Sequence, residues 1–308
     1  MSLTRDIIVL LSTYNGEHYM SEQLESLRTQ TVADRMHVMM RDDGSTDSTA
    51  SIPSAMDLSP LTIEVSRGRN LGARDSFSAL IAVVPPTART IMLCDQDDVW
   101  RPEKAAVAAA ALAVVTDGIP ALYCGRSTAT DSSLNPIGLT DDAPRGPSLR
   151  SALFQNIAPG HTMAFNPTLA TLYAETIRTG AVMHDWWLYL LASGLGTVEF
   201  DDAPHALYRL HDHNDIGYSI TRLKRLRRDL GRLLREDRSL VTRQALAFRQ
   251  AVGSRLPDDD RAMVDAFLDQ KSLARRLDYL RHYPMQPQGR RPPWVSTLLF
   301  LAGRYRTA

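Results

Sequence analysis

The sequence predicts an α/β protein: a doubly wound, mainly parallel sheet followed by a helical C-terminal extension. Short runs that are continuously apolar alternate with longer amphipathic stretches, which is typical of βαβ units. A polar, turn-rich segment follows each apolar run, where ligands bind in sheets of this kind. The charge also changes along the chain, because the formal net charge of zero divides into −11 for residues 1–217 and +11 for residues 218–308.

Four apolar runs are the expected strands, at residues 6–12, 37–40, 61–65 and 90–94. Because each run is continuously apolar and does not alternate, we expect strands that are buried on both faces of a parallel sheet. Apolar residues recur at helical spacing over residues 19–27, and residues 73–84 form a second such stretch. These two stretches are the expected helices between the strands.

Composition and cysteine usage limit the class of protein. A chain of 308 residues with 44% hydrophobic and 23% charged residues has the usage of a soluble globular protein with a large core. Cys94 and Cys124 lie in apolar runs without disulfide or metal spacing, which indicates small buried side chains in a reducing compartment. The first residues lack the pattern of a signal peptide, so we expect a cytoplasmic protein.

Carboxylates gather at the expected carboxyl edge of the sheet. They are Asp42, Asp43, Asp95, Asp97 and Asp98. Unpaired carboxylates at this spacing would repel one another, so we expect a cation to neutralise them. Hard oxygen ligands suit Mg²⁺ or Mn²⁺, and Mg²⁺ is usually held by one or two carboxylates together with substrate phosphates. The sequence therefore predicts that the fourth strand delivers Asp95 and Asp97 to a metal that carries a diphosphate.

Several segments together resemble the inverting glycosyltransferases of family 2, whose nucleotide-sugar-binding fold is called GT-A. These segments are "STYNGEHYMSEQLESL", "RDDGSTDST", "NLGARDSF" and "CDQDDVWRPEK". Further along the chain, "GHTMAFN", "HDWWLYLLASG" and "YRLHDHNDIG" resemble the rhamnosyltransferase-like branch. The resemblance implies a GT-A catalytic domain over residues 1–217 and leaves residues 218–308 as a basic, mainly helical extension.

The resemblance also implies roles for individual residues. Those that would bind the nucleotide, phosphate or sugar of the donor are Thr13, Tyr14, Asn15, Asp42, Arg74, Asp95 and Asp98. Those that would hold the metal are Asp95, Asp97 and His211. Asp185 matches the catalytic base of the family.

The residues around Asp185 independently suit a general base. Glycosyl transfer with inversion needs a base for the acceptor hydroxyl and positive charge for the departing diphosphate. Asp185 precedes an apolar helix onset that would partly desolvate its carboxylate and raise its pKa, although the same position also suits a helix N-cap. Trp186 and Trp187 are candidates for stacking on acceptor sugars, and we expect at least one of them to pack in the core.

We therefore expect a metal-dependent inverting transferase that acts in cell-surface polysaccharide synthesis. The branch resemblance implies dTDP-rhamnose as donor and a glycan or lipid-linked acceptor. A nucleotide-sugar-binding or scaffold protein without catalysis is the alternative, against which the intact Asp95, Asp97 and Asp185 argue. A zinc site is a weaker alternative, because the four nearby histidines lack zinc-motif spacing. They are His184, His205, His211 and His213.

The basic extension leaves two interpretations open. Over residues 222–237, leucines recur at helical intervals opposite arginines, which suits either packing on the enzyme body or contact with anionic lipid. Residues 294–303 form an apolar run flanked by arginines, which favours a peripheral contact at the inner face of the membrane. Nucleic-acid binding is the weakest alternative, since no aromatic-interleaved recognition motif accompanies the charge.

Overall fold

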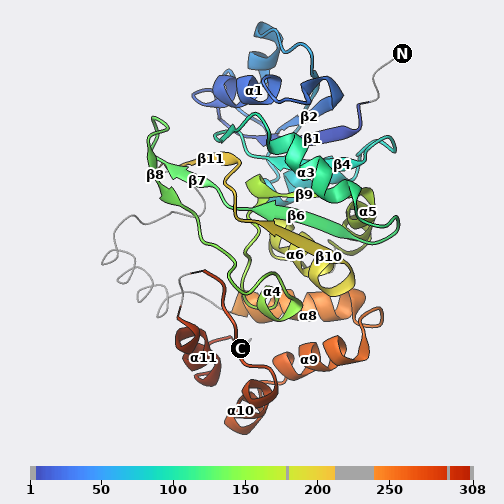
Figure 1. Ribbon diagram of the computed structural model, residues 1–308, viewed down its shortest axis with the longest axis vertical. Helices are drawn as coiled ribbons and strands as arrows, with labels where there is room; N and C mark the ends of the chain where they lie inside the picture. Colours follow the sequence, from blue (N-terminus) through green and yellow to red (C-terminus); the bar gives the residue numbers. More distant parts are fainter. Residues whose placement is uncertain (1–4, 178–179, 212–238, 290–291, 306–308) are drawn as a thin grey trace.

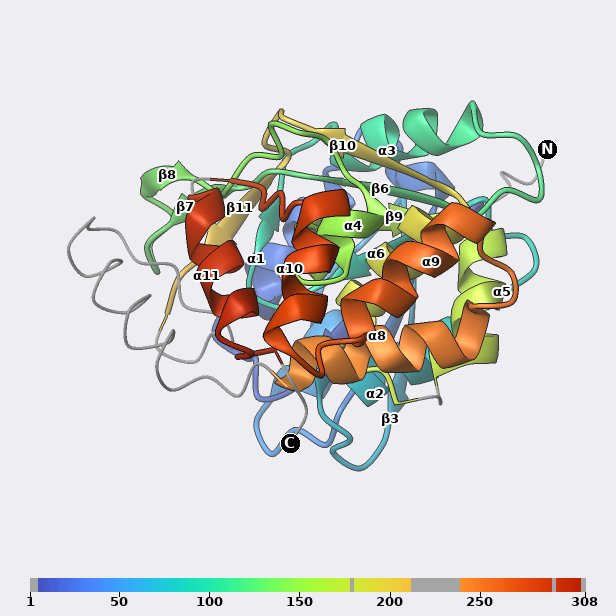
Figure 2. The same ribbon diagram turned by 90° about the horizontal axis from the view of Figure 1, so that it is seen from below.

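A seven-stranded sheet forms the centre of the molecule. The computed structural model describes residues 5–177, 180–211, 239–289 and 292–305 (Figures 1 and 2). The strand order is β10-β6-β9-β4-β1-β2-β3, and every neighbouring pair is parallel except the two pairs made by β9. The expected α/β class with a mainly parallel sheet is confirmed.

Four of these strands are the ones expected from the apolar runs. They are β1 (Ile7–Thr13), β2 (Met36–Asp42), β3 (Thr62–Arg67) and β4 (Thr90–Cys94). β1 and β4 are buried on both faces, as expected, and most of β2 is buried. For β3 the expectation was wrong: its last four residues are exposed, because it lies at the edge of the sheet with a neighbour on one side alone.

The register of the parallel strands aligns their carboxyl ends. Thr13 is level with Asp42, and Asp42 is level with Arg67. Leu11 of β1 is level with Cys94, the last residue of β4. The loops that follow these strands therefore meet at one edge of the sheet, where the sequence places its carboxylates.

Helices cover both faces of this sheet (Figure 1). One apolar layer includes α1 (Met20–Arg28) and α3 (Lys104–Ala113). The opposite layer includes α2 (Ala73–Ile81), α5 (Pro167–Thr176) and α6 (His184–Leu195). Shorter helices are η1 (Ala33–Arg35), η2 (Thr49–Ala55), α4 (Leu149–Ala152) and η3 (Gly160–Thr162).

The second half of the chain completes the large sheet and adds a small one. β6 (Ala121–Gly125), β9 (Ala164–Phe165) and β10 (Thr197–Asp201) join the large sheet. The small sheet has the order β5-β11-β7-β8, and consists of β5 (Val99–Trp100), β11 (Ala206–Arg209), β7 (Thr128–Thr130) and β8 (Pro136–Leu139). Trp100 pairs with Ala206, which brings the end of β11 beside the loop after β4.

The C-terminal helices pack against the rest of the molecule. They are α8 (Ser239–Val252), α9 (Asp258–Leu268), α10 (Leu273–His282) and α11 (Pro293–Leu301). Phe248 of α8 meets Trp187 of α6 edge-on, with 6.2 Å between ring centres, and both side chains are fully buried. These helices share one apolar core with α2 and α6. The helix expected over residues 222–237 lies outside the described residues.

Among the residues that the structure describes, no helix is both long enough and apolar enough to cross a membrane.

Candidate active site

The loops after β1 and β2 are fastened to each other at the carboxyl edge. The side-chain oxygen of Asn15 accepts a hydrogen bond from Thr46 N at 2.9 Å, and Asn15 N donates to Ser45 Oγ at 2.9 Å. Asn15 has a φ of 48°, a left-handed conformation that asparagine tolerates better than most residues. Thr13 is buried at the end of β1 and donates to Arg41 O.

Two adjacent carboxylates after β2 have different partners. Asp42 is fully buried and accepts from Arg67 Nε at 2.9 Å. Asp43, for which the sequence predicted no donor contact, pairs with Arg41 and accepts from Leu71 N and Gly72 N at 2.9 Å each. Asp43 therefore fixes the turn before α2, while Asp42 pairs with the exposed Arg67 at the carboxyl edge of the sheet.

Gln96 lies between Asp95 and Asp97, which together form an Asp-any-Asp motif, and it connects the loop after β4 to the loop after β1. Its Oε1 accepts from Tyr14 N at 2.8 Å, and its Nε2 donates to Tyr14 O at 3.0 Å. A Cβ on Gly16 would lie 2.3 Å from Gln96 Oε1, so the close approach requires glycine. The Tyr14 side chain is 47% exposed at this edge, where it can contact a ligand.

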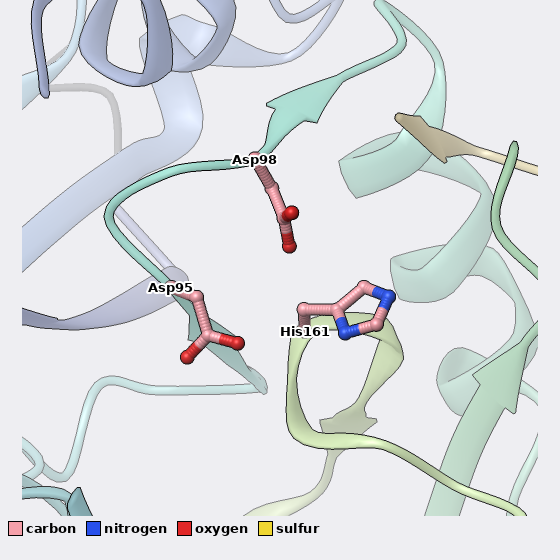
Figure 3. A group of neighbouring side chains, drawn as sticks. All are labelled: Asp95, Asp98 and His161. Atoms are coloured by element: carbon pink, nitrogen blue, oxygen red, sulfur yellow. The ribbon is translucent and has the colours of Figure 1, made fainter. Parts of the chain in front are cut away.

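Asp95, Asp98 and His161 form a cluster with the donor set of a cation site (Figure 3). One ligand atom from each lies within 4.8 Å of the others. Asp98 is buried, its Oδ1 accepts from Arg209 N at 3.2 Å, and its buried Oδ2 has no hydrogen-bond partner within the described part of the chain. Burial, followed by the charges of Asp97 and Asp95, raises the pKa of Asp98 well above its usual range. A divalent cation would satisfy this carboxylate.

His161 meets this cluster as a neutral imidazole. Burial lowers its pKa to about 3, and the nearby Lys104 acts in the same direction. Its Nε2 lies 2.8 Å from Ser127 Oγ, and its ring stacks on Tyr208 with 4.7 Å between centres. A neutral imidazole with one nitrogen engaged by a hydroxyl leaves the other available to a metal.

Lys104 places a buried amine beneath the same cluster. Its Nζ donates to His161 O and lies 3.7 Å from the centre of the Trp100 ring. Burial lowers the pKa of Lys104 to about 8, although Asp98 and Asp95 act in the opposite direction. The amine is thus a built-in positive neighbour of the carboxylates.

The predicted metal set of Asp95, Asp97 and His211 is divided between two groupings. Asp97 Oδ2 lies 2.7 Å from His211 Nε2, and the His211 ring stacks on Tyr19 with 5.1 Å between centres. Asp95 instead groups with Asp98 and His161. The Asp97–His211 pair joins the loop after β4 to the residues after β11.

Arg209 was missing from the predicted site. Its guanidinium is buried, donates through Nε to Asp97 O at 2.9 Å, pairs with Glu22 and lies 4.7 Å from the centre of the Tyr19 ring. It holds the Asp-any-Asp loop against α1. The signal available in the sequence was its place two residues before His211.

Asp185 lies in the first turn of α6 and is nearly buried. Its Oδ2 accepts from Asn156 Nδ2 at 3.0 Å, and its Oδ1 accepts from Trp186 N at 2.6 Å. The N-cap residue is Met183, so the alternative of an N-cap role for Asp185 was wrong. One oxygen is thus oriented by an amide side chain from a separate segment, as suits a positioned base.

The two tryptophans after Asp185 differ in burial, which bears on the expectation that they stack on acceptor sugars. Trp187 is fully buried and donates to Thr176 Oγ1 at 3.0 Å, so it cannot contact an acceptor. The expectation that at least one tryptophan packs in the core is confirmed. Trp186 is half-buried and donates to Ala152 O at 2.6 Å.

Arg74 and the other histidines have local partners. The Arg74 guanidinium pairs with Asp75 and donates to Ala181 O at 2.9 Å, which ties α2 to the segment before α6. His205 lies between Glu103 and Asp201, and His184 stacks on Phe77. Of the four histidines considered for a zinc site, the three that the structure describes therefore have different partners. His213 lies outside the described residues.

Known proteins of similar sequence or fold, and one family model, resemble this chain. Residues 8–152 match the model of glycosyl transferase family 2. The dTDP-rhamnosyl transferase RfbG of Shigella flexneri is 27% identical over 227 residues, covering 68% of this chain and 75% of the relative. The uncharacterized glycosyltransferase alr2836 of Nostoc sp. is 32% identical over 99 residues, 32% of this chain and 30% of the relative. TarS residues 1–349 of S. aureus, solved with UDP-GlcNAc, share the fold with a TM-score of 0.55 at 14% identity, over 97% of this chain and 88% of that one.

Proposed function

We propose a metal-dependent inverting enzyme of glycosyl transferase family 2 that moves a sugar from a nucleoside diphosphate to a hydroxyl acceptor, and the match of residues 8–152 to the model of that family supports the assignment. The observation that carries the proposal is the convergence, at one sheet edge, of Asp42, the Asp95–Asp98–His161 cluster and the Asp97–His211 pair. Division of the chain into a catalytic unit, residues 1–217, and an extension, residues 218–308, is part of this proposal.

The donor would lie across the carboxyl ends of β1, β2 and β4. Thr13, Tyr14 and Asn15 would contact the nucleotide, with Asp42 accepting a hydrogen bond from its base. The half-exposed Tyr14 and the buried, Arg67-paired Asp42 support this placement. Arg74, which pairs with Asp75, would turn toward the phosphate or sugar once the donor binds.

The residues of the carboxyl edge fit a Mg²⁺ or Mn²⁺ ion. Asp95, Asp97 and His211 would hold it, and Asp98 and His161 would add ligands or orient the sugar. Oxygen-rich ligand sets suit these hard cations. When bound, the ion supplies positive charge to the departing diphosphate.

Asp185 would act as the base. Its carboxylate takes the proton of the acceptor hydroxyl as the hydroxyl oxygen bonds to the anomeric carbon and the bond from that carbon to the diphosphate breaks. Asn156, 3.0 Å from Oδ2, orients the carboxylate. Attack opposite the leaving group inverts the anomeric configuration.

We propose dTDP-rhamnose as the donor and a glycan or lipid-linked acceptor in cell-surface polysaccharide synthesis. The 27% identity to a dTDP-rhamnosyl transferase over 75% of its length supports this choice. A lipid-linked acceptor would be met at the inner, cytoplasmic face of a membrane, where the basic extension would lie.

Thermal unfolding with a panel of nucleotide sugars tests the proposal, because a ligand that binds the native state alone raises its stability. We expect dTDP-rhamnose to raise the unfolding temperature most, and Mn²⁺ or Mg²⁺ to increase the effect. Incubation with an acceptor should then give a product of inverted anomeric configuration. A donor that binds but is neither transferred nor hydrolysed would favour the binding-protein alternative.

A further inference from the structure

Helices α10 and α11 present four large apolar side chains to solvent. Exposed fractions are 52% for Leu273, 51% for Leu277, 63% for Trp294 and 56% for Leu298. Within each helix the two residues are four apart and so lie on one helix face. Figure 2 shows the two helices adjoining on the face of the molecule seen there. These four residues are named the α10–α11 surface.

The opposite faces of both helices are anchored in the core. Tyr279 of α10 and Phe300 of α11 are buried, with 4.9 Å between their ring centres. Phe267 of α9 stacks on Phe300 with 5.6 Å between centres. The core is therefore built from the opposite faces of these helices, and the fold leaves the apolar side chains of the α10–α11 surface in contact with solvent. A single exposed leucine needs no explanation, whereas four large side chains on two adjoining helices indicate a binding surface.

The same part of the chain is strongly basic. Between Lys271 and Arg304 the sequence has seven Lys and Arg residues and one acidic residue, Asp278. Lys271, Arg275, Arg281 and Arg304 are exposed. The acidic residues of the neighbouring helix α9 are Asp258, Asp259 and Asp260 in its first turn and Asp265, which pairs with Arg249. The positive charge thus coincides with the apolar side chains of α10 and α11.

We propose that the α10–α11 surface binds anionic lipid and holds the enzyme on the membrane from one side. Apolar side chains with tryptophan, surrounded by lysine and arginine, insert shallowly among lipid headgroups while the basic groups meet anionic phosphates. A second copy of the chain is the less suitable occupant, because two equally basic surfaces would repel. The purpose of this membrane contact rests on the proposed function, because a lipid-linked acceptor would lie in that membrane.

Co-sedimentation of the full chain with vesicles tests the surface. The vesicles contain phosphatidylcholine alone or mixed with phosphatidylglycerol, each at low and high salt. We expect binding to the mixed vesicles alone, weakened by salt because exposed charges are screened. The variant Trp294→Ser/Leu298→Ser should bind about tenfold or more weakly. The matched control, Val83→Ser/Val114→Ser, changes two apolar residues of the body that are 62% and 84% exposed, and should bind like the wild type.

Tryptophan fluorescence gives an independent measurement. Trp100 and Trp187 are buried and Trp186 is half-buried, so a blue shift on adding mixed vesicles reports chiefly on Trp294. The shift should be absent in Trp294→Phe, which keeps an apolar ring and should still bind the vesicles.

Three results would overturn the proposal. They are no vesicle binding by the wild type under any condition, equal binding by the serine variant, and concentration-dependent self-association that the serine substitutions abolish. Donor-induced thermal stabilisation is measured on every variant and should not change. Vesicle binding without donor binding would reject the proposed function but support lipid binding by the α10–α11 surface. Donor binding without vesicle binding would support the proposed function and reject lipid binding.

Discussion

Asp185 has one oxygen bound to an amide side chain and the other to its own helix turn, so substitution can remove its basicity while retaining much of its geometry. We expect Asp185→Asn to keep donor affinity and lower kcat by about 10²- to 10⁴-fold, the usual contribution of a general base. Steady-state kinetics with calorimetry of donor binding measures both. The control Asn156→Ala keeps the carboxylate and should lose less activity. Near-normal turnover of Asp185→Asn would assign the base elsewhere.

Asp97 lies in the loop after β4, outside the apolar core, and is paired with His211. We expect Asp97→Ala to abolish the metal-dependent part of nucleoside diphosphate binding and leave the fold intact, because the change removes a proposed ligand. Calorimetry with and without Mn²⁺ measures this part. Asp117→Ala, an exposed carboxylate before β6, serves as control and should bind normally. Equal diphosphate affinity in wild type and Asp97→Ala would exclude Asp97 from the metal site.

Burial of His161 should make the folded state less stable as the pH falls. Its pKa is lowered from 6.5 to about 3 in the folded state. Between these values the unfolded chain binds a proton that the folded chain does not, so stability is lost as the pH falls below 6.5. The loss has a limiting slope of about 1.4 kcal/mol per pH unit for one such group. Urea unfolding in chelator from pH 7 to pH 4 should show a smaller slope for His161→Asn, and an unchanged slope would refute the assignment.

At the scale of elements, the loops after β1 and β4 are joined through Gln96. A methyl group at Gly16 would displace the Gln96 side chain, so Gly16→Ala and Gln96→Ala should lose the same two hydrogen bonds. Each hydrogen bond contributes about 0.5 to 1.5 kcal/mol to stability, so losing both should lower the free energy of unfolding, measured in urea, by about 1 to 3 kcal/mol. The double variant should equal either single variant. Additive losses of this free energy would show that the bridge does not couple the loops.

Helix α8 packs against α6 in a shared apolar core. Phe248 is fully buried against Trp187, whereas Leu246 of the same helix is 43% exposed. We expect Phe248→Ala to lower the free energy of unfolding by about 3 to 5 kcal/mol, the usual cost of deleting a buried ring. Leu246→Ala should change it by less than about 0.5 kcal/mol. Urea unfolding compares them, and equal effects would mean that the α8 packing is not as described.

For the molecule as a whole, the sequence predicts those features that depend on residues close together in the chain. The runs before Thr13, Asp42 and Asp95 are continuously apolar because both faces are covered, so strands and the carboxylates after them could be read together. Edge position is not encoded locally, which is why the exposure of β3 was missed.

Long-range neighbours explain the rest of the omissions. His161 enters the cluster because β9 is antiparallel to β4, so the residues before β9 reach the carboxyl edge. Arg209 and Gln96 act through side-chain contacts with residues remote in sequence, and the only signal for either was the position of Arg209 two residues before His211. Trp187 is buried because α8 covers it, and α8 begins more than forty residues later.

The groups at the carboxyl edge are far apart in the sequence, so they leave the ribosome at different times during translation. Asp97 and His211 are 114 residues apart. At synthesis rates of about 5 to 20 residues per second, Asp97 leaves the ribosome roughly 6 to 23 s before His211. At the start of that interval the nascent chain carries an acidic loop without His161, Arg209 or His211, and the sheet still lacks β9 between β4 and β6. His161 and β9 follow in the course of it, and Arg209 and His211 come last. The proposed ligand set is completed only when synthesis has passed β11, so a chain released earlier would bear the acids of the site without Arg209 and His211.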